Sequence, residues 1–326
     1  MTLNRPKVFI ASKLPKEAET YIAKFCDYEK WEGKGTIPKE ELFQKLYDKD
    51  GAILTGIPIN QELLEHAPVL KVVSNVSVGY NNFDLDAMKV RKIIGTNTPG
   101  ALDNTVADLV LGLMITSARR IAQLDRYVKE GKWKQEDNSN LFGLDVYGAT
   151  LGIIGMGRIG EAIAKRAKYG FDMEVLYYNR NRKYEAEKNL GVKYSTFEAL
   201  LKTSDFIVLI VPFTENTYHL IGNKEFNMMK NSALFINASR GQTVDEEALI
   251  WALQNKKIFG AGLDVYEKEP INLDNALLGM PNVVTLPHIG SATEKTRFDM
   301  AMAAAKNLVS ALSGEKALGC VPELKD

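Results

Sequence analysis

The stretch from Thr150 to Lys183 constrains the fold of this chain more than any other. A short apolar run, Leu151–Ile154, is typical of a buried parallel strand, and the glycine turn Gly155-Met156-Gly157-Arg158-Ile159-Gly160 follows at once. A helical pattern comes next, and Met173 to Tyr178 reads as a second strand. In such a βαβ unit the three glycines allow a tight turn, close approach of a pyrophosphate and close packing of helix on strand. The sequence therefore predicts a dinucleotide site here, in preference to a glycine-rich packing turn.

The end of the second strand indicates which dinucleotide binds. An NAD site places Asp or Glu about 20 residues beyond the glycines to bind the ribose 2′-hydroxyl. This chain has Asn179-Arg180-Asn181-Arg182-Lys183 at that place, without a carboxylate. A carboxylate would repel a 2′-phosphate, whereas an arginine can hold it through bidentate, charge-assisted hydrogen bonds. The turn therefore favours NADP, with NAD as the weaker alternative; a solvated basic turn is the other interpretation.

Length, charge balance and cysteine content limit the classes of protein to which this chain can belong. The length of 326 residues suggests two domains, and 41 basic against 41 acidic side chains leave no charge excess for nucleic acid or an anionic membrane. Cys26 and Cys320 form no CxxC and no ligand cluster. The start of the chain lacks the apolar core of a signal peptide, and no apolar run is long enough to cross a bilayer. We expect a cytoplasmic protein without a metal site.

The order of predicted elements indicates an α/β fold in two parts. In the first third, strands alternate with helices, the strands at 7–10, 51–54, 71–74 and 93–94 and the helices at 16–25, 39–47, 61–67 and 84–90. Thr98-Pro99-Gly100 is a candidate boundary, and a helical pattern runs from Asp103 to about Glu130.

The alternation resumes after the glycine-turn unit. Predicted strands lie at 192–194, 205–211, 233–237, 259–265 and 283–286. Predicted helices lie at 197–202, 215–221, from 224, at 245–254 and at 292–312. Both parts are therefore expected to be parallel sheets covered by helices.

Side chains that can take part in catalysis follow the strands of the second predicted sheet. An open parallel sheet binds its ligands at that edge. His288 follows the last strand, and a histidine there can exchange a proton at working pH. Glu269 could accept its other N–H and favour the charged ring. Arg240 offers a planar fork to a carboxylate or a carbonyl oxygen. Each alone could be an ordinary surface residue, and His66 and His219 are better explained as capping and packing residues.

Spaced motifs carry a family resemblance that extends over nearly the whole chain. These motifs are the glycine turn, Ser77–Tyr80, Asn237–Gly241, Gly262–Pro270 and Leu286–Thr293. Together they resemble the D-2-hydroxyacid dehydrogenase family. Within the family the chain is most similar to NADP-dependent glyoxylate/hydroxypyruvate reductases, because of the turn Asn179–Arg182. The resemblance implies NADPH-dependent reduction of a small 2-oxoacid, glyoxylate to glycolate or hydroxypyruvate to D-glycerate.

The resemblance also implies a role for each residue of the site. Arg240, Glu269 and His288 match the family's catalytic residues. The substrate would be held by Leu54, Arg240 and the backbone N–H groups of Val78 and Gly79. The implied cofactor residues are Thr105, Gly155, Gly157, Arg158, Ile159, Asn179, Arg180, Arg182, Val211, Pro212, Thr217, Ala238, Ser239, Asp264 and Gly290.

The family's organisation completes the expectation. It implies a Rossmann nucleotide domain at 101–291 and a flavodoxin-like, discontinuous substrate domain at 1–100 and 292–326. It also implies a homodimer, for which we expect Leu141 and Phe142 to lie at the interface. The rival functions are a 2-ketogluconate reductase, another D-2-hydroxyacid dehydrogenase and a cofactor-sensing interaction protein. Pocket size separates the substrates, and turnover separates an enzyme from a sensor.

Overall fold

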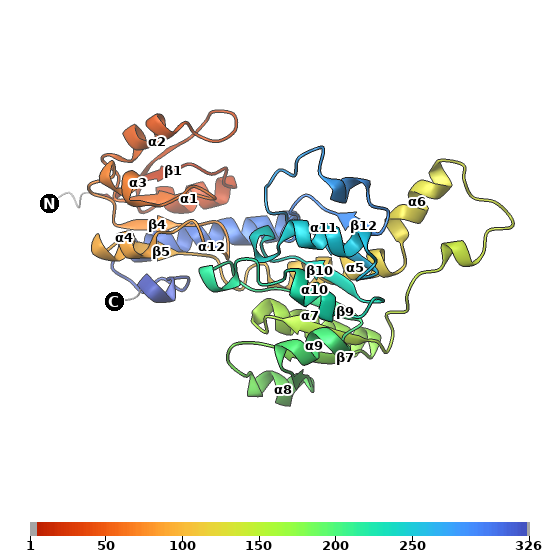
Figure 1. The fold of residues 1–326 in the computed structure, drawn as a ribbon. Helices are drawn as coiled ribbons and strands as arrows, with labels where there is room; N and C mark the ends of the chain where they lie inside the picture. Colours follow the sequence, from red (N-terminus) through yellow and green to blue (C-terminus); the bar gives the residue numbers. More distant parts are fainter. Residues whose placement is uncertain (1–4, 325–326) are drawn as a thin grey trace. The chain divides into compact units, whose positions relative to one another are not determined.

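The computed structural model describes residues 5–324 and divides into two compact units (Figure 1). Unit 1 comprises residues 1–102 and 292–326, and unit 2 comprises residues 103–291. Each unit contains a single parallel sheet, of five strands in unit 1 and seven in unit 2. Parallel strands need crossover connections, and helices supply most of them, as the alternation in the sequence predicts.

The sheet of unit 1 has the order β2-β1-β3-β4-β5. Its strands are β1 (Lys7–Ile10), β2 (Asp27–Lys30), β3 (Gly51–Ile53), β4 (Val72–Ser74) and β5 (Ile94–Thr96). Its helices are α1 (Lys16–Ala23), α2 (Lys39–Leu46), α3 (Gln61–Glu65), α4 (Leu85–Val90), α12 (Glu294–Leu312) and the 3₁₀ turn η5 (Pro322–Leu324). This is the flavodoxin-like strand order, so that part of the fold prediction is confirmed.

One strand of this sheet is absent from the sequence prediction. β2, Asp27-Tyr28-Glu29-Lys30, pairs with β1 at the edge of the sheet, and only Tyr28 is not fully exposed. An edge strand needs no apolar face, and charged residues there discourage pairing with another chain. Its sequence therefore lacks the apolar run by which the other strands were predicted.

The C-terminal helix α12 belongs to unit 1 because its small apolar face packs on that sheet. Ala301, Ala305 and Leu308 lie in one buried cluster with strand residues such as Val8. The hydroxyl of Ser74 at the end of β4 donates to the Ala304 carbonyl at 3.0 Å. The chain thus returns to its first sheet after unit 2 is complete.

Unit 2 has the sheet order β12-β11-β10-β9-β6-β7-β8. The strands are β6 (Thr150–Ile154), β7 (Glu174–Tyr178), β8 (Lys193–Tyr194), β9 (Phe206–Leu209), β10 (Leu234–Asn237), β11 (Gly260–Leu263) and β12 (Val283–Thr285). The α-helices are α5 (Asp103–Ala118), α6 (Ile121–Lys129), α7 (Arg158–Phe171), α8 (Tyr184–Leu190), α9 (Phe197–Thr203), α10 (Asn223–Met228) and α11 (Glu246–Gln254). The 3₁₀ turns are η1 (Ser139–Leu141), η2 (Glu215–Thr217), η3 (Gly241–Thr243) and η4 (Ala276–Gly279). The predicted Rossmann order is confirmed, with β12 as a seventh strand.

Two helix predictions in unit 2 were wrong. The pattern from 103 to about 130 is split, because Arg120 adopts the left-handed conformation at φ 56°. Its guanidinium donates to the carbonyls of Asn140 and Phe142 at 2.7 and 3.0 Å. The predicted helix 215–221 is only the short turn η2, whose Thr217 hydroxyl donates to the Pro212 carbonyl at 2.8 Å. A long-range contact breaks the first predicted helix, and a side-chain hydrogen bond shortens the second. Neither segment contains a glycine or proline at the break that would have indicated it.

Candidate active site

The glycine turn lies at the point where the strand order of unit 2 reverses, between β6 and β9. Gly155 has φ 110°, and a Cβ there would lie 2.5 Å from the Ile210 carbonyl oxygen. A Cβ on Gly160 would lie 2.3 Å from the Gly155 carbonyl oxygen, so strand and helix α7 approach too closely for a side chain. A Cβ on Gly157 would meet no atom within 4 Å, so its backbone borders open space at the start of α7. This geometry fits a pyrophosphate at a helix N-terminus.

The turn after β7 carries the predicted 2′-phosphate residues. Asn179 donates from its amide to the Asn181 carbonyl at 2.9 Å. Arg180 is exposed and forms no ion pair with a carboxylate among residues 5–324. Arg182 does form one, a two-point contact with Glu187 at 2.8 and 2.7 Å. The two arginines therefore differ in their surroundings, which the sequence did not indicate.

The other predicted cofactor residues of unit 2 lie along one rim of its sheet or close to it. Ile159 is in the first turn of α7, and Thr105 is in the first turn of α5. Val211 and Pro212 follow β9, Ala238 and Ser239 follow β10, Asp264 follows β11 and Gly290 follows β12.

Several of these side chains are already engaged within the chain. Arg158 pairs with Asp103 at 3.1 Å. The buried Ser239 hydroxyl contacts Asn237 Oδ1 at 2.7 Å, and the Thr217 hydroxyl contacts the Pro212 carbonyl. Their roles towards a cofactor remain predictions.

Glu269 and His288 form a direct pair. His288 Nδ1 lies 2.7 Å from Glu269 Oε2, and the backbone N–H of Tyr266 donates to Glu269 Oε1 at 3.1 Å. Burial raises the pKa of Glu269, but the hydrogen bonds from His288 and Tyr266 and the nearby Arg240 charge outweigh it and lower that pKa below its ordinary value. Glu269 is therefore an ionised partner. Because it engages Nδ1, Nε2 is the ring nitrogen left to exchange a proton.

Asp264 fixes the backbone beside His288. His288 adopts φ 52°, in the left-handed region that non-glycine residues rarely occupy. The next two backbone N–H groups, of Ile289 and Gly290, donate to Asp264 Oδ1 and Oδ2 at 2.7 and 2.8 Å. Burial raises the pKa of Asp264, and these two hydrogen bonds act in the opposite direction. The sequence prediction gave Asp264 to the cofactor and did not include this contact with the catalytic loop.

Arg240 is held close to the segment that carries Glu269. A Cβ on Gly241 would lie 1.8 Å from the Tyr266 backbone, so only glycine allows the two segments to approach this closely. The Thr243 hydroxyl closes this turn by donating to the Arg240 carbonyl at 2.6 Å. Burial lowers the pKa of Arg240, and the charge of Glu269 acts in the opposite direction. The three predicted catalytic residues are therefore brought into one electrostatic group.

The predicted substrate loop of unit 1 presents unpaired backbone donors. The Val78 carbonyl accepts from the Asn97 amide at 2.7 Å, and the Gly79 carbonyl accepts from the Ser77 hydroxyl at 2.6 Å. Within the described part of the chain, no group accepts from the N–H of Val78 or Gly79. Two adjacent free N–H groups suit a carboxylate. The side chain of Leu54 is fully buried in the core of unit 1.

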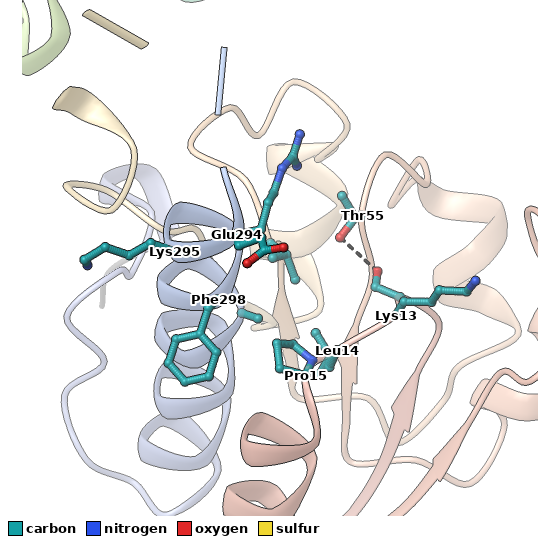
Figure 2. Close-up of a pocket in the computed structure, with 11 residues that line it drawn as sticks. Lys13, Leu14, Pro15, Thr55, Glu294, Lys295 and Phe298 are labelled. Carbon is teal, nitrogen blue, oxygen red and sulfur yellow. Dashed lines mark hydrogen bonds between the residues drawn. The ribbon is translucent and has the colours of Figure 1, made fainter. Parts of the chain in front are cut away.

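A cavity of about 740 Å³ lies at the carboxyl ends of β1, β3 and β4 in unit 1. Figure 2 shows Glu294, Lys295 and Phe298 on the first turns of α12, with Leu14 and Pro15 on the facing segment. The hydroxyls of Ser12 and Thr55 meet at 2.9 Å across the cavity wall. The full lining is Ser12, Lys13, Leu14, Pro15, Thr55, Val76, Glu294, Lys295, Arg297, Phe298 and Ala301.

Between residues 5 and 324, no helix is long and apolar enough to span a membrane. The same residues contain no group of three or more His, Cys, Asp or Glu side chains placed to hold a metal ion.

Comparison with known proteins places this geometry in a family. Residues 111–290 match the family described as D-isomer specific 2-hydroxyacid dehydrogenase, NAD binding domain. The chain is 44% identical over 317 residues to glyoxylate/hydroxypyruvate reductase B of Enterobacter sp. (strain 638), covering 97% of this chain and 98% of that protein. It is 46% identical over 316 residues to the glyoxylate reductase of Thermococcus litoralis, covering 95% of each.

A solved structure gives the same likeness in three dimensions. The NADPH-dependent glyoxylate/hydroxypyruvate reductase of Sinorhizobium meliloti, in complex with NADP and malonate, has a TM-score of 0.86 and 32% identity, covering 98% of each chain.

A Rossmann unit with an Arg, Glu and His group at its rim defines a dinucleotide-dependent oxidoreductase. The chain belongs to the D-isomer specific 2-hydroxyacid dehydrogenase family. Its predicted fold class and family resemblance are confirmed.

Proposed function

We propose that the enzyme reduces a small 2-oxoacid with NADPH, converting glyoxylate to glycolate and hydroxypyruvate to D-glycerate. The observation that carries this proposal is the 2.7 Å contact between Glu269 and His288, within a group that includes Arg240. The reductases from Enterobacter and Thermococcus, which are similar over almost their full length, support the choice of substrate.

The residues of the chain supply the proton and the charge stabilisation. NADPH, when bound, supplies the hydride. His288, whose Nδ1 contacts the ionised Glu269, donates its Nε2 proton to the substrate oxygen. Arg240 stabilises the negative charge that grows on that oxygen. We propose unit 1 as the substrate domain, because the free N–H groups of Val78 and Gly79 suit the substrate carboxylate.

The turn after β7 supports NADPH over NADH. Arg180 is exposed and its charge is not compensated by a described carboxylate, so it can pair with a 2′-phosphate. No Asp or Glu stands at the turn to bind a ribose 2′-hydroxyl. NADH remains a weaker alternative cofactor. The NADP complex of the Sinorhizobium enzyme supports this preference.

The direct experiment is NADPH oxidation followed by absorbance over a panel of 2-oxoacids. We expect the highest kcat/KM with glyoxylate or hydroxypyruvate. Absence of turnover with every 2-oxoacid would favour the cofactor-sensing protein, against which the intact Arg240, Glu269 and His288 group argues.

A second candidate substrate is 2-ketogluconate, whose polyhydroxylated tail needs a larger pocket than glyoxylate does. The same panel decides this: a kcat/KM for 2-ketogluconate above that for both small acids would make it the better substrate.

We also propose a homodimer in the cytoplasm. Trp133 and Phe142 are 67% and 65% exposed on the segment between α6 and β6, so both side chains are accessible to a partner subunit. Cys26 and Cys320 form no disulfide with each other, which suits a reducing compartment. Light scattering tests the assembly, and a monomeric mass at assay concentration would contradict it.

A further inference from the structure

A hydrogen-bond network centred on one buried tyrosine holds the turn that follows β7. The phenol of Tyr177, a fully buried residue, accepts a hydrogen bond from the Lys183 N–H at 2.7 Å. The same phenol donates to Glu187 Oε1 at 2.7 Å. Glu187 lies on α8, so one strand side chain ties the far end of the turn to the next helix. The turn Asn179–Arg182 is therefore a braced loop and not a loose basic segment.

Arg182 belongs to this network. Its Nε and Nη2 donate to the two oxygens of Glu187 at 2.8 and 2.7 Å. The guanidinium carbon also lies 5.0 Å from the ring centre of Tyr184 and 5.5 Å from that of Tyr194, within the range of cation–π contacts. The hydrogen bonds from Arg182 and Tyr177 lower the pKa of Glu187 to about 2. The carboxylate that neutralises Arg182 is thus charged at any working pH.

Arg180 has none of these constraints. It is exposed, and no carboxylate within residues 5–324 pairs with it. The hydrogen bond from the Asn179 amide to the Asn181 carbonyl fixes the backbone on either side of it. An incoming phosphate would meet an uncompensated cation at Arg180 and an already neutralised one at Arg182.

We propose that Arg180 grips the 2′-phosphate and that Arg182, Glu187 and Tyr177 form a positioning unit that holds Arg180 in place. This assignment rests on the proposed NADPH function and departs from the sequence prediction, which gave both arginines to the phosphate. It makes Glu187 and Tyr177 determinants of cofactor specificity that act through the turn.

The two assignments predict opposite outcomes for one pair of variants. Arg182→Gln removes the cation that neutralises the Glu187 carboxylate, which then keeps only the hydrogen bond from Tyr177, and the added negative charge at the turn lowers NADPH affinity. A second change, Glu187→Gln, removes that charge, and the two amides can bond to each other in place of the ion pair. A positioning role therefore predicts rescue by the second change. Direct contact with the phosphate predicts no rescue, because the guanidinium is still missing.

The experiment is calorimetric titration of the enzyme with NADPH and with NADH. We expect Arg180→Gln to weaken NADPH binding by roughly 10- to 150-fold, the range for one hydrogen bond to a charged group. Arg182→Gln should weaken it by about fivefold, as one exposed like charge would. The double variant Arg182→Gln with Glu187→Gln should recover to within about twofold of wild type. NADH affinity is the internal reference and should change least.

Tyr177→Phe provides a test that changes no charge. It removes both hydrogen bonds of the phenol, so NADPH binding should weaken more than NADH binding. Equal weakening of both cofactors would mean a general structural role and would overturn the positioning role.

A double variant that binds NADPH as weakly as Arg182→Gln would overturn the proposal while leaving the NADPH preference intact. A wild type that binds NADPH no more tightly than NADH would overturn the proposed cofactor, and the role of the turn with it.

Discussion

Unit 2 contains two histidine–glutamate pairs that differ in what surrounds them. His288 contacts Glu269 through Nδ1 at 2.7 Å, and His219 contacts Glu267 through Nε2 at 3.0 Å. Both histidines adopt a positive φ, 52° and 47°. The ring of His219 stacks on that of Tyr218, with 3.9 Å between the ring centres, and its Nε2 is the atom that contacts Glu267. His288 uses Nδ1 for its pair, which leaves Nε2 for the proposed proton transfer, so a histidine–glutamate pair alone does not define a catalytic histidine.

Support from neighbouring groups separates the two pairs further. Glu269 also accepts a backbone N–H and lies in the field of Arg240, and the residues after His288 are clamped by Asp264. The two arginines of the cofactor turn differ in the same manner, since Arg182 is paired and Arg180 is exposed. In both places the group free to meet a ligand is the one expected to carry function.

The largest expected effect comes from removing the imidazole of His288, the proposed proton donor. His288→Ala should lower kcat by roughly 10²- to 10⁴-fold, the usual contribution of a general acid, while cofactor binding survives. His219→Ala is the matched control and should change kcat by less than about threefold. Steady-state kinetics with glyoxylate measures both. Equal losses in the two variants would erase the distinction between the pairs.

Arg240→Lys tests whether charge alone is sufficient beside Glu269. Lysine keeps the charge but loses the planar fork, so kcat/KM should fall by roughly 10²-fold and KM for the oxoacid should rise. Kinetics over a range of substrate concentrations separates the two parameters. A lysine variant as active as wild type would show that two-point contact is not needed.

The cofactor turn predicts a change of preference. Asn179→Asp combined with Arg180→Ile should lower kcat/KM with NADPH by at least the roughly 10- to 150-fold expected for one lost charged hydrogen bond. The new carboxylate repels the phosphate and offers an acceptor to the ribose hydroxyl, so the ratio should move towards NADH. Kinetics with both cofactors gives the ratio, and a variant whose ratio does not move would place phosphate recognition elsewhere.

The smallest expected effect is a shift of the pH profile. The pKa of Glu269 is lowered, so its carboxylate is ionised through the working range and stabilises a charged imidazole. Glu269→Gln replaces that charge with a neutral amide, which should move the profile of kcat to lower pH. Glu267→Gln should leave the profile in place. Movement of the Glu269→Gln profile to higher pH would contradict the pairing.

The sequence was most informative where a single local rule decides the structure. The spacing of the glycines predicted the geometry of their turn correctly. Gly155 and Gly160 are both required by close backbone contacts that lie close to the turn itself. Alternating apolar runs predicted both sheets, and β2 was missed because an exposed edge strand carries no such run.

The sequence was least informative where distant residues meet. Nothing near Arg120 indicates a break in the helix, which depends on carbonyls 20 and 22 residues further along. Likewise, the pairing of Arg182 with Glu187 across the start of α8, and the clamp of Asp264 on the loop after His288, have no fixed spacing by which to recognise them. Family resemblance predicted which residues form the site, and the structure showed which groups they contact.

The most direct test is kcat/KM for glyoxylate reduction by wild-type enzyme with NADPH and with NADH, measured beside Arg180→Gln. We expect turnover with both cofactors, a clear preference for NADPH and loss of most of that preference in the variant. A wild type that prefers NADH, or a preference that survives Arg180→Gln, would contradict the assignment of the turn, and absence of turnover with either cofactor would contradict the proposed reaction.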